Sequence, residues 1–242
     1  MSNKPSTSSK RQQIRQQRQQ KDRQRRMITV AIIAGIALIL VAVIVIPNMI
    51  PSEVVAITPI ARPQSNGREL GSSSAPVVVE VFEDFQCPAC ARYSESIEPL
   101  IVNSYVTDGR VRYIFRHYPF IDDRVARKES DQAANASMCA ADQGRFWDYH
   151  DIVFANWNGE NQGSFVDKRL VTFAESIGLD MDAFNQCFKE NIFINEINAD
   201  IALAEQYAVN ATPSIYVNGV KVESPSADSI QQAIEQALAS GS

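Results

Sequence analysis

Glu83-Asp84-Phe85-Gln86-Cys87-Pro88-Ala89-Cys90 is the stretch of sequence that decides the fold. The residues before it, 77–82, are apolar except for one acid and rich in valine, which predicts a strand. The residues after it carry apolar side chains at spacings of three and four, which predicts a helix to about residue 106. The two cysteines therefore stand where a strand ends and a helix begins.

The position of Cys87 at a helix N-terminus has a chemical consequence. Unpaired backbone N–H groups and the helix dipole favour negative charge there, so we expect the pKa of this thiol to fall below that of a free cysteine. Pro88 suits the first helical position, because its missing N–H has no helical partner to lose. Cys90 follows one turn later on the same face, so its sulfur can reach that of Cys87 and form a disulfide.

Two cysteines with this spacing also supply half of many zinc sites. A structural zinc site needs two more ligands, and the other candidates form no second paired motif: Cys139, Cys187, His117 and His150. The strand–turn–helix context therefore favours redox chemistry over metal binding, and we expect neither a metal nor a cofactor. The two histidines are not expected to act in the reaction.

Residues 1–26 form a basic tail rich in glutamine. They contain nine Lys or Arg residues and one acid, although the whole chain of 242 residues has a net charge of −5. The tail lacks the apolar side chains of a core, so we expect it to be disordered. Basic tails can indicate nucleic-acid binding, but the next segment gives a better reason for this charge, and no nucleic-acid partner is expected.

Residues 27–46 form an apolar run without a charged residue. About 20 residues at about 1.5 Å each span about 30 Å, the thickness of a bilayer core, so the run predicts one transmembrane helix. Basic residues crowd its N-terminal flank only, which predicts a cytoplasmic N-terminus, a single pass through the cell membrane and an extracytoplasmic domain. A cleaved signal peptide is the alternative, but no suitable small-residue site follows, so an uncleaved signal-anchor is favoured.

Residues 47–74 contain several prolines and a Gly/Ser cluster and are expected to be a linker to a folded domain over residues 75–242. That domain would lie in an oxidising environment, where disulfides persist. Four cysteines allow three pairings. The short loop between the first two cysteines is one candidate, which leaves Cys139 with Cys187 as a structural disulfide. Two free buried thiols are the alternative for this second pair.

The order of elements within the domain predicts an α/β fold with a helical insert. The strand before the cysteines, the helix after them and a second strand over 111–117 predict a parallel pair with a right-handed crossover. Apolar stripes at helical spacing occupy residues from about 124 to 209, which we interpret as an all-helical insert. The α/β part resumes with a hairpin that turns at Asn218-Gly219 and a last amphipathic helix over 227–239.

This order resembles the thioredoxin superfamily, and more closely the DsbA-like thiol–disulfide oxidoreductases, in which a helical domain interrupts the thioredoxin fold. The resemblance covers about residues 75–240. It rests on motifs that occur in the same order: Asp84-Phe85-Gln86-Cys87-Pro88-Ala89-Cys90, Phe115-Arg116-His117-Tyr118-Pro119, Gln143-Gly144-Arg145-Phe146-Trp147 and Ala211-Thr212-Pro213. It implies an α/β thioredoxin fold with an inserted all-helical domain, preceded in this chain by the N-terminal transmembrane helix.

The resemblance also implies a role for each residue around the cysteines. Cys87 matches the nucleophilic cysteine and Cys90 the buried resolving cysteine. Pro213 matches the cis-proline beside the disulfide, and the backbone of Thr212 would pair with an extended substrate peptide. The best-known oxidases have histidine where this chain has Ala89, so one group that would stabilise the thiolate is missing. The identity of this residue leaves the oxidising strength open.

Two acids near the cysteines are further candidates. Glu80 interrupts the apolar strand, and a partly buried acid there could take the proton of Cys90. A position at a sheet edge or facing solvent is the alternative for this residue. Asp84 lies closer to the cysteines and is expected to hold the turn together.

Together these observations predict a membrane-anchored, extracytoplasmic enzyme, a protein thiol–disulfide oxidoreductase that forms disulfides in secreted proteins by exchange at Cys87 and Cys90. The expected partners are reduced or unfolded secreted proteins and, by the resemblance, a quinone-linked membrane oxidase that reoxidises the enzyme. A reductase or isomerase on the same fold is one alternative. A module that holds a metal or a peptide at the cysteines without turnover is another.

Overall fold

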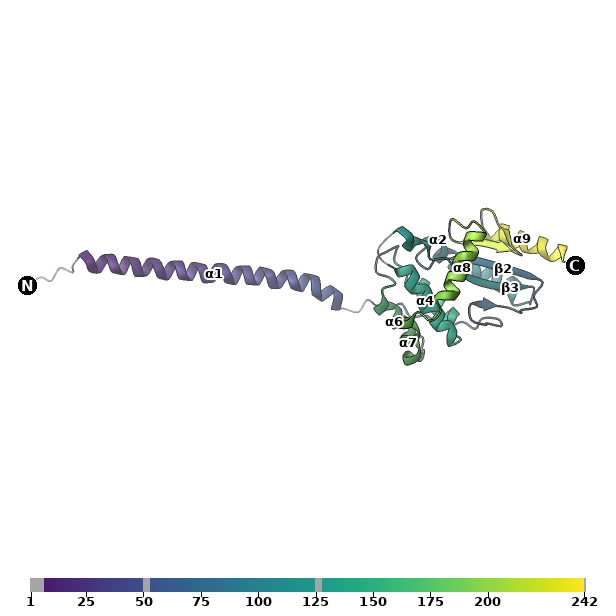
Figure 1. Ribbon diagram of the computed structural model, residues 1–242, viewed down its shortest axis with the longest axis horizontal. Helices are drawn as coiled ribbons and strands as arrows, with labels where there is room; N and C mark the ends of the chain where they lie inside the picture. Colours follow the sequence, from purple (N-terminus) through teal and green to yellow (C-terminus); the bar gives the residue numbers. More distant parts are fainter. Residues whose placement is uncertain (1–6, 50–52, 125–127, 242) are drawn as a thin grey trace, which may run out of the picture. The chain divides into compact units, whose positions relative to one another are not determined.

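The computed structural model describes residues 7–49, 53–124 and 128–241. The chain divides into two compact units, Met1–Glu53 and Val54–Ser242. The first unit contains one long helix, and the second contains a mixed sheet with helices around it (Figure 1).

Helix α1 (Thr7–Met49) includes both the basic tail and the apolar run. The predicted disorder of the tail is therefore wrong from residue 7 onward, and residues 1–6 lie outside the described part of the chain. Gln, Arg and Lys have good helix propensity, and neither Gly nor Pro interrupts residues 7–34. One segment of α1, Arg23–Val41, is long and apolar enough to cross a membrane, by length and composition, and it overlaps the predicted span.

The sheet of the second unit has five strands in the order β1-β3-β2-β4-β5. Its central strand, β2 (Val77–Glu83), pairs in parallel with β3 (Val111–His117). On its other side β2 pairs antiparallel with β4 (Ser214–Val217), which forms a hairpin with β5 (Val220–Lys221). The predicted parallel pair and the predicted hairpin are both confirmed.

Strand β1 (Glu69–Leu70) lies in the segment that was expected to be a linker. It joins the edge of the sheet, antiparallel to β3, and Leu70 is fully buried. Farther upstream, the side chain of Asn156 accepts a hydrogen bond from the backbone N–H of Val55 at 2.8 Å and donates one to its carbonyl at 2.9 Å. The linker prediction for residues 47–74 is therefore wrong for the part of this segment that belongs to the second unit.

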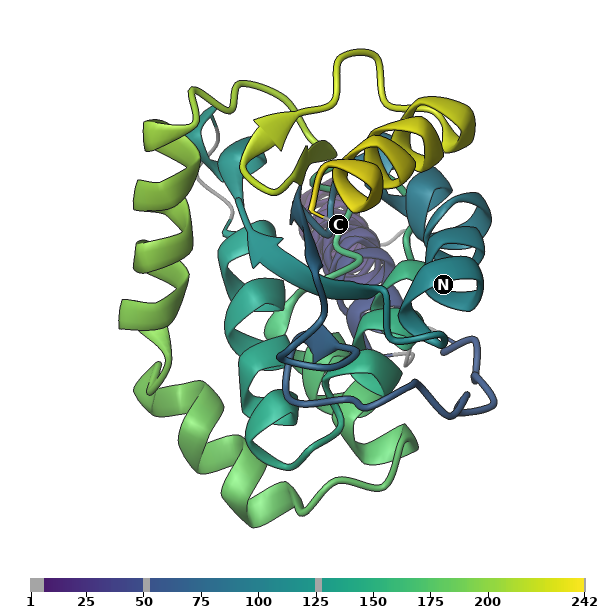
Figure 2. The same cartoon turned by 90° about the vertical axis from the view of Figure 1, so that its right-hand side faces the viewer.

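Helices cover both faces of the sheet. Helices α2 (Pro88–Ser96), α3 (Glu98–Ile101) and α9 (Ala227–Ser240) lie on one face. Helix α8 (Ile194–Gln206) packs against the other face, beside β3. Figure 2 shows α8, in light green, and α9, in yellow, on opposite sides of the strands.

The described part of the segment between β3 and β4 consists of helices joined by loops, as predicted for about 124–209. After a 3₁₀ turn over Phe120–Arg124, its helices are α4 (Glu129–Asp142), α5 (Phe146–Ala155), α6 (Asp167–Ser176), α7 (Met181–Glu190) and α8. Phe146 of α5 packs edge-on against Phe115 of β3, with ring centroids 5.3 Å apart. Such contacts join the helical insert and the sheet in one hydrophobic core.

The helix predicted to run from the cysteines to about residue 106 is present but divided. Helix α2 ends at Ser96, α3 begins at Glu98, and a π-helical turn over Val102–Val106 follows. Pro99 lies just after the break and has no backbone N–H to donate to a helical hydrogen bond. Glu98, at the start of α3, is fully buried.

Candidate active site

Cys87 lies at the N-terminus of α2. Strand β2 ends at Glu83 and α2 begins at Pro88, so the cysteine is the cap residue of the helix. Its backbone N–H donates to the carbonyl of Asp84 at 2.9 Å, which closes the turn between strand and helix. Its side chain is only 7% exposed, whereas Pro88 and Ala89 beside it are half-buried. Cys87 is therefore nearly buried at the end of the helix, beside two residues that are more exposed.

The loop before β4 lies against the same sulfur. The Thr212–Pro213 peptide bond is cis. The thiol of Cys87 donates a hydrogen bond to the carbonyl oxygen of Thr212 at 3.2 Å. The hydroxyl of Thr212 is buried and makes no hydrogen bond within the described residues. The structure thus brings the cysteine and the Thr-Pro pair together, although they are 125 residues apart in the sequence.

The surroundings of Cys87 favour its thiolate. The hydrogen bond from the Cys90 thiol has the largest effect on its pKa, and burial opposes this effect. The hydroxyl of Thr212, which makes no hydrogen bond while Cys87 is a thiol, becomes a donor once the sulfur is ionised. Two backbone N–H groups in the first turn of α2 are donors as well. Together these groups lower the pKa of Cys87 from 9.0 to about 6. At pH 7 the sulfur is therefore mostly ionised, as expected for a cysteine at a helix N-terminus.

Cys90 behaves in the opposite way. It is fully buried, and burial, the hydrogen bond to Cys87 and the charge of Glu83 raise the pKa of Cys90 well above its ordinary value. Glu83 is itself 1% exposed, and burial, followed by the charges of Glu98 and Cys87, raises the pKa of Glu83 well above its usual range. An acid in this position can exchange a proton with Cys90 as the disulfide opens and closes.

The acid beside Cys90 is therefore Glu83 and not Glu80, for which the proton-transfer role was predicted. The two residues are three positions apart in β2, so they point to opposite faces of the sheet. Glu80 lies on the α8 side and forms an ion pair with Arg116 at 2.6 Å, and Arg116 also pairs with Asp200 at 3.1 Å. Sequence reasoning missed Glu83 because this residue was interpreted as part of the turn between the strand and the helix. In a strand buried on both faces, the sequence pattern holds no signal that could have singled out Glu83.

Asp84 fastens the turn, in line with its expected role. Its Oδ1 accepts hydrogen bonds from the backbone N–H of Gln86 at 2.8 Å and the hydroxyl of Ser130 at 2.6 Å. Its Oδ2 accepts a hydrogen bond from the backbone N–H of Ile121 at 3.0 Å. Burial raises the pKa of Asp84 to about 7. The carboxyl group therefore orders the segment that carries Cys87.

Gln86, which sequence reasoning did not single out, connects the turn to the helical insert. Its amide donates to Asp122 at 3.0 Å and to Ser130 at 2.8 Å. Its side-chain oxygen accepts from the backbone N–H of Asn161 at 2.6 Å, and its carbonyl accepts from the indole of Trp157 at 2.7 Å. The residue before Cys87 is thus held from four directions.

Cys139 of α4 and Cys187 of α7 form a disulfide with an S–S distance of 2.00 Å, and they lie 48 residues apart in the sequence. Both are buried, at 1% and 5% exposure. The two active-site cysteines are free. His117 is buried against Phe115, and burial lowers the pKa of His117 well below its usual value, so this histidine is neutral in the core.

Comparison with known proteins identifies the family. The family described as thioredoxin matches residues 64–236 of the chain. The chain belongs to this family. The match to thioredoxin begins before residue 75 and includes β1, in agreement with the place of this strand in the sheet.

Curated relatives of the chain differ in how much of their length they share with it. A probable disulfide bond formation protein D of Bacillus anthracis is 28% identical over 178 residues, covering 72% of this chain and 79% of that protein. The Na⁺/H⁺ antiporter NhaA 3 of Salinispora tropica is 32% identical over 171 residues, or 70% of this chain. The chain spans only 24% of that antiporter's length.

The fold of the chain is also found among solved structures. The crystal structure of oxidised BdbD from Bacillus subtilis matches with a TM-score of 0.64 at 26% identity, covering 78% of this chain and 100% of that chain. With the family and the relatives, this makes the chain a DsbA-like thiol–disulfide oxidoreductase of the thioredoxin superfamily. The expected fold class is confirmed.

Proposed function

We propose that this enzyme donates the Cys87–Cys90 disulfide to reduced proteins outside the cytoplasm. A substrate thiolate attacks Sγ of Cys87, the bond to Cys90 breaks, and Cys90 leaves with the electron pair and takes up a proton. The substrate is then joined to Cys87 by a mixed disulfide. A second substrate thiolate attacks the substrate's own sulfur and releases the Cys87 thiolate. The substrate has lost two electrons and the enzyme has gained them.

The lowered pKa of Cys87 is the observation that carries this direction. With a pKa of about 6, ionisation at pH 7 stabilises the reduced enzyme by about 1.4 kcal/mol relative to ordinary thiols, which raises the reduction potential by about 30 mV. A more stable reduced state makes the disulfide a stronger oxidant. The effect is modest, as expected where Ala89 replaces the histidine of the best-known oxidases.

The backbone beside cis-Pro213 supplies the proposed docking site for the substrate peptide. The carbonyl of Thr212 accepts a hydrogen bond from the Cys87 thiol at 3.2 Å. Once the sulfur is bonded to a substrate, this thiol proton is gone and the carbonyl can accept from a peptide N–H instead. Pairing through the backbone binds extended peptides with little regard to their side chains, which suits an enzyme with many substrates.

We further propose that the segment over residues 27–46 anchors the enzyme in the cell membrane, with its N-terminus in the cytoplasm. The basic residues before this segment support that orientation. An anchored enzyme stays close to secreted proteins as they emerge. It also stays close to a membrane oxidase linked to quinones, which would remove the two electrons and restore the disulfide.

The reduction potential of the Cys87–Cys90 pair tests the direction of the reaction. Residues 54–242 are equilibrated with glutathione buffers, and the fraction of free thiol is measured. A disulfide donor is expected at or above about −180 mV, towards the value of about −120 mV known for DsbA. A value near about −270 mV, as in thioredoxin, would overturn the donor role in favour of a reductase and leave the exchange chemistry in place.

Mixed disulfides test the exchange itself. Cys90→Ala keeps the attacking sulfur and removes the resolving one, so this variant is expected to accumulate covalent complexes with reduced secreted proteins. Cys87→Ser is the matched control and is expected to form none. A peptide-binding module would retain its partner in both variants, and that result would contradict enzymatic turnover.

A further inference from the structure

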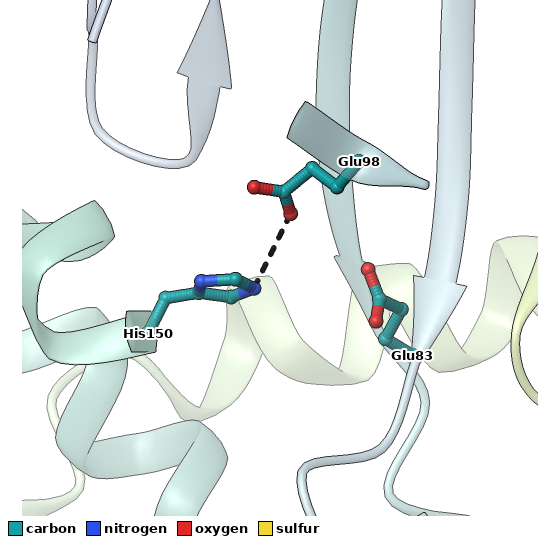
Figure 3. A group of neighbouring side chains, drawn as sticks. All are labelled: Glu83, Glu98 and His150. Carbon is teal, nitrogen blue, oxygen red and sulfur yellow. Dashed lines mark ion pairs between the residues drawn. The ribbon is translucent and has the colours of Figure 1, made fainter. Parts of the chain in front are cut away.

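Three ionisable side chains meet on the inner side of the active site. Glu83 ends β2, Glu98 begins α3, and His150 lies in α5. Their exposed fractions are 1%, 0% and 0%. Figure 3 shows the polar ends of the three side chains turned toward one another. Of the three, only Glu83 has been given a role in the exchange reaction, as the acid beside Cys90.

The atoms that face this common space lack partners. Both carboxylate oxygens of Glu83, Oε2 of Glu98 and Nε2 of His150 are buried and make no hydrogen bond in the described part of the chain. Oε2 of Glu98 and Nε2 of His150 are 3.5 Å apart, and one atom from each of the three residues lies within 4.8 Å of the others. Buried polar atoms without partners are rare in folded proteins, so this concentration of them indicates a missing ligand.

The other ends of two of these side chains are fixed by hydrogen bonds. Nδ1 of His150 lies 2.9 Å from a carboxylate oxygen of Asp151 and donates its proton there, so Nε2 is the ring atom turned toward the common space. Arg62 donates to Oε1 of Glu98 at 2.8 Å and to Asp151 at 2.7 Å, which leaves Oε2 of Glu98 free. A carboxylate behind an imidazole is the usual support of a metal-binding histidine.

The nearby cation does not serve this space. Arg62 contacts Oε1 of Glu98 and Oδ1 of Asp151, which are turned away from it. A divalent cation bound between the three side chains would give their buried polar atoms a partner and would displace any proton that they hold. We infer that Glu83, Glu98 and His150 form a binding site for a divalent transition-metal ion of the Zn²⁺ type.

The donor atoms select this class of ion. Two carboxylates and an imidazole are ligands that Zn²⁺ accepts, whereas Mg²⁺ and Ca²⁺ prefer oxygen atoms alone. Ligands about 2.0–2.1 Å from a tetrahedral ion lie about 3.3–3.5 Å from one another, close to the 3.5 Å between Glu98 and His150. Three protein ligands leave a fourth position open. This site adjoins the paired cysteines through Glu83, which lies beside Cys90, but it does not use their sulfur atoms.

A pocket between α2 and α5 lies next to the residue that supports His150. Asp151, which holds the imidazole of His150, lines this pocket together with Glu95, Arg92, Phe154 and Trp157. The three proposed ligands do not line it, so one residue, Asp151, separates the pocket from His150.

Zinc binding to the full chain in detergent tests the inference. Cys87 and Cys90 are first oxidised, because their thiolates would otherwise bind the metal. Equilibrium dialysis against ZnCl₂ is expected to give one Zn²⁺ per chain. Glu83→Gln keeps the shape of the side chain but removes its charge, and is expected to weaken binding by at least about 100-fold. Glu80→Gln, the same change on the opposite face of β2, is expected to leave binding unaltered.

Failure of the parent chain to retain zinc, or equal binding by both variants, overturns the site whatever the direction of disulfide exchange. If Glu83→Gln does not fold, Asp151→Asn replaces it. This change leaves the three ligands in place, removes the charge behind His150 and weakens the contact with Arg62, and it is expected to weaken binding by about 10–100-fold. Crystals of the oxidised chain soaked in ZnCl₂ are expected to show an anomalous peak between the three ligands. A peak elsewhere alone also overturns the inference.

Discussion

The charge on one sulfur atom governs the behaviour of the active site. Cys87 accepts hydrogen bonds from the thiol of Cys90 and from the first turn of α2, and burial limits their effect. Because Cys90 is held as a thiol by its own burial, it remains a donor over the range in which Cys87 ionises. The two cysteines therefore act as a pair with one nucleophile and one proton carrier.

The pH dependence of alkylation should reveal this asymmetry. The rate at which iodoacetamide modifies the reduced enzyme follows the thiolate of Cys87, so it is expected to rise with pH around a midpoint of about 6. Cys90→Ala removes the strongest donor and is expected to move the midpoint upward. A parent midpoint near that of a free cysteine, about 8.5, would contradict the assigned surroundings.

Thr212→Val tests the second side-chain donor. Valine has nearly the same shape but no hydroxyl, so the pKa of Cys87 is expected to rise, by less than it does in Cys90→Ala. The thiolate absorbance near 240 nm as a function of pH measures this shift. While Cys87 is a thiol, the hydroxyl has no partner among the described residues, so the free energy of unfolding measured below the pKa of Cys87 should not fall. An unchanged pKa would show that the hydroxyl does not act on the sulfur.

The sequence identified the two reacting cysteines but assigned the acid beside them to Glu80 instead of Glu83. Positions three apart in a strand face opposite sides of the sheet. Cys87, Cys90 and Pro213 belong to motifs whose chemistry is local, so their spacing was enough to predict them. Glu80 and Glu83 lie in a strand buried on both faces, and the sequence pattern of such a strand does not reveal which face looks toward the cysteines. That choice depends on helices packed from elsewhere in the chain.

At the scale of the elements, the active-site turn is secured mainly by the helical insert. Gln86 reaches Asp122, Ser130 and Asn161, all of which lie between β3 and β4. The insert also carries the apolar residues that cover the cysteines, including Ile121 and Phe154. These contacts link residues that are far apart in sequence. Hydrophobic periodicity could therefore predict the helices but not the contacts that they make with the active-site turn.

Gln86→Leu is expected to destabilise the fold. The change leaves the buried groups of Asp122 and Ser130 without their amide partner, which costs about 1–3 kcal/mol of unfolding free energy. Urea denaturation followed by circular dichroism measures it. Gln206→Leu, at an exposed position at the end of α8, is the control and should change the unfolding free energy by less than about 0.5 kcal/mol. Equal effects of the two changes would refute the role of this residue as a link.

Replacement of both Cys139 and Cys187 by alanine tests the bond between α4 and α7. A link that closes a loop of 48 residues is expected to contribute about 4 kcal/mol, by restricting the unfolded chain. Guanidinium unfolding of the double variant should show most of this loss. The alkylation midpoint of Cys87 should stay where it is, because the bond lies within the insert. A loss below about 1 kcal/mol would argue that the bond contributes little to stability.

The molecule as a whole consists of a long helix and a folded unit that begins earlier than its sequence indicated. Proline and glycine made residues 47–74 look like a linker, and the strand within them is only two residues long. Such a strand has no periodic pattern to recognise, since its pairing with β3 is a tertiary contact. The apolar run of α1 was visible from composition alone.

Truncation tests whether the folded unit begins at residue 54, as in the structure, or at residue 75, as the sequence predicted. A chain that begins at residue 54 is expected to unfold cooperatively, whereas one that begins at residue 75 should be strongly destabilised. The shorter chain loses Leu70 from the core and removes Arg62 from the buried carboxylate of Glu98, which costs about 3–5 kcal/mol for the ion pair alone. Thermal unfolding of the two chains makes the comparison. Equal melting temperatures would restore the linker interpretation.

The bond between Cys139 and Cys187 makes each molecule a product of the chemistry it is proposed to perform. Both sulfurs are enclosed once α4 and α7 have packed, so the bond must form while a newly synthesised chain is still open. The first copies in a cell therefore need an outside oxidant to mature. Under the proposed donor role, copies already at work would form this bond in those that follow.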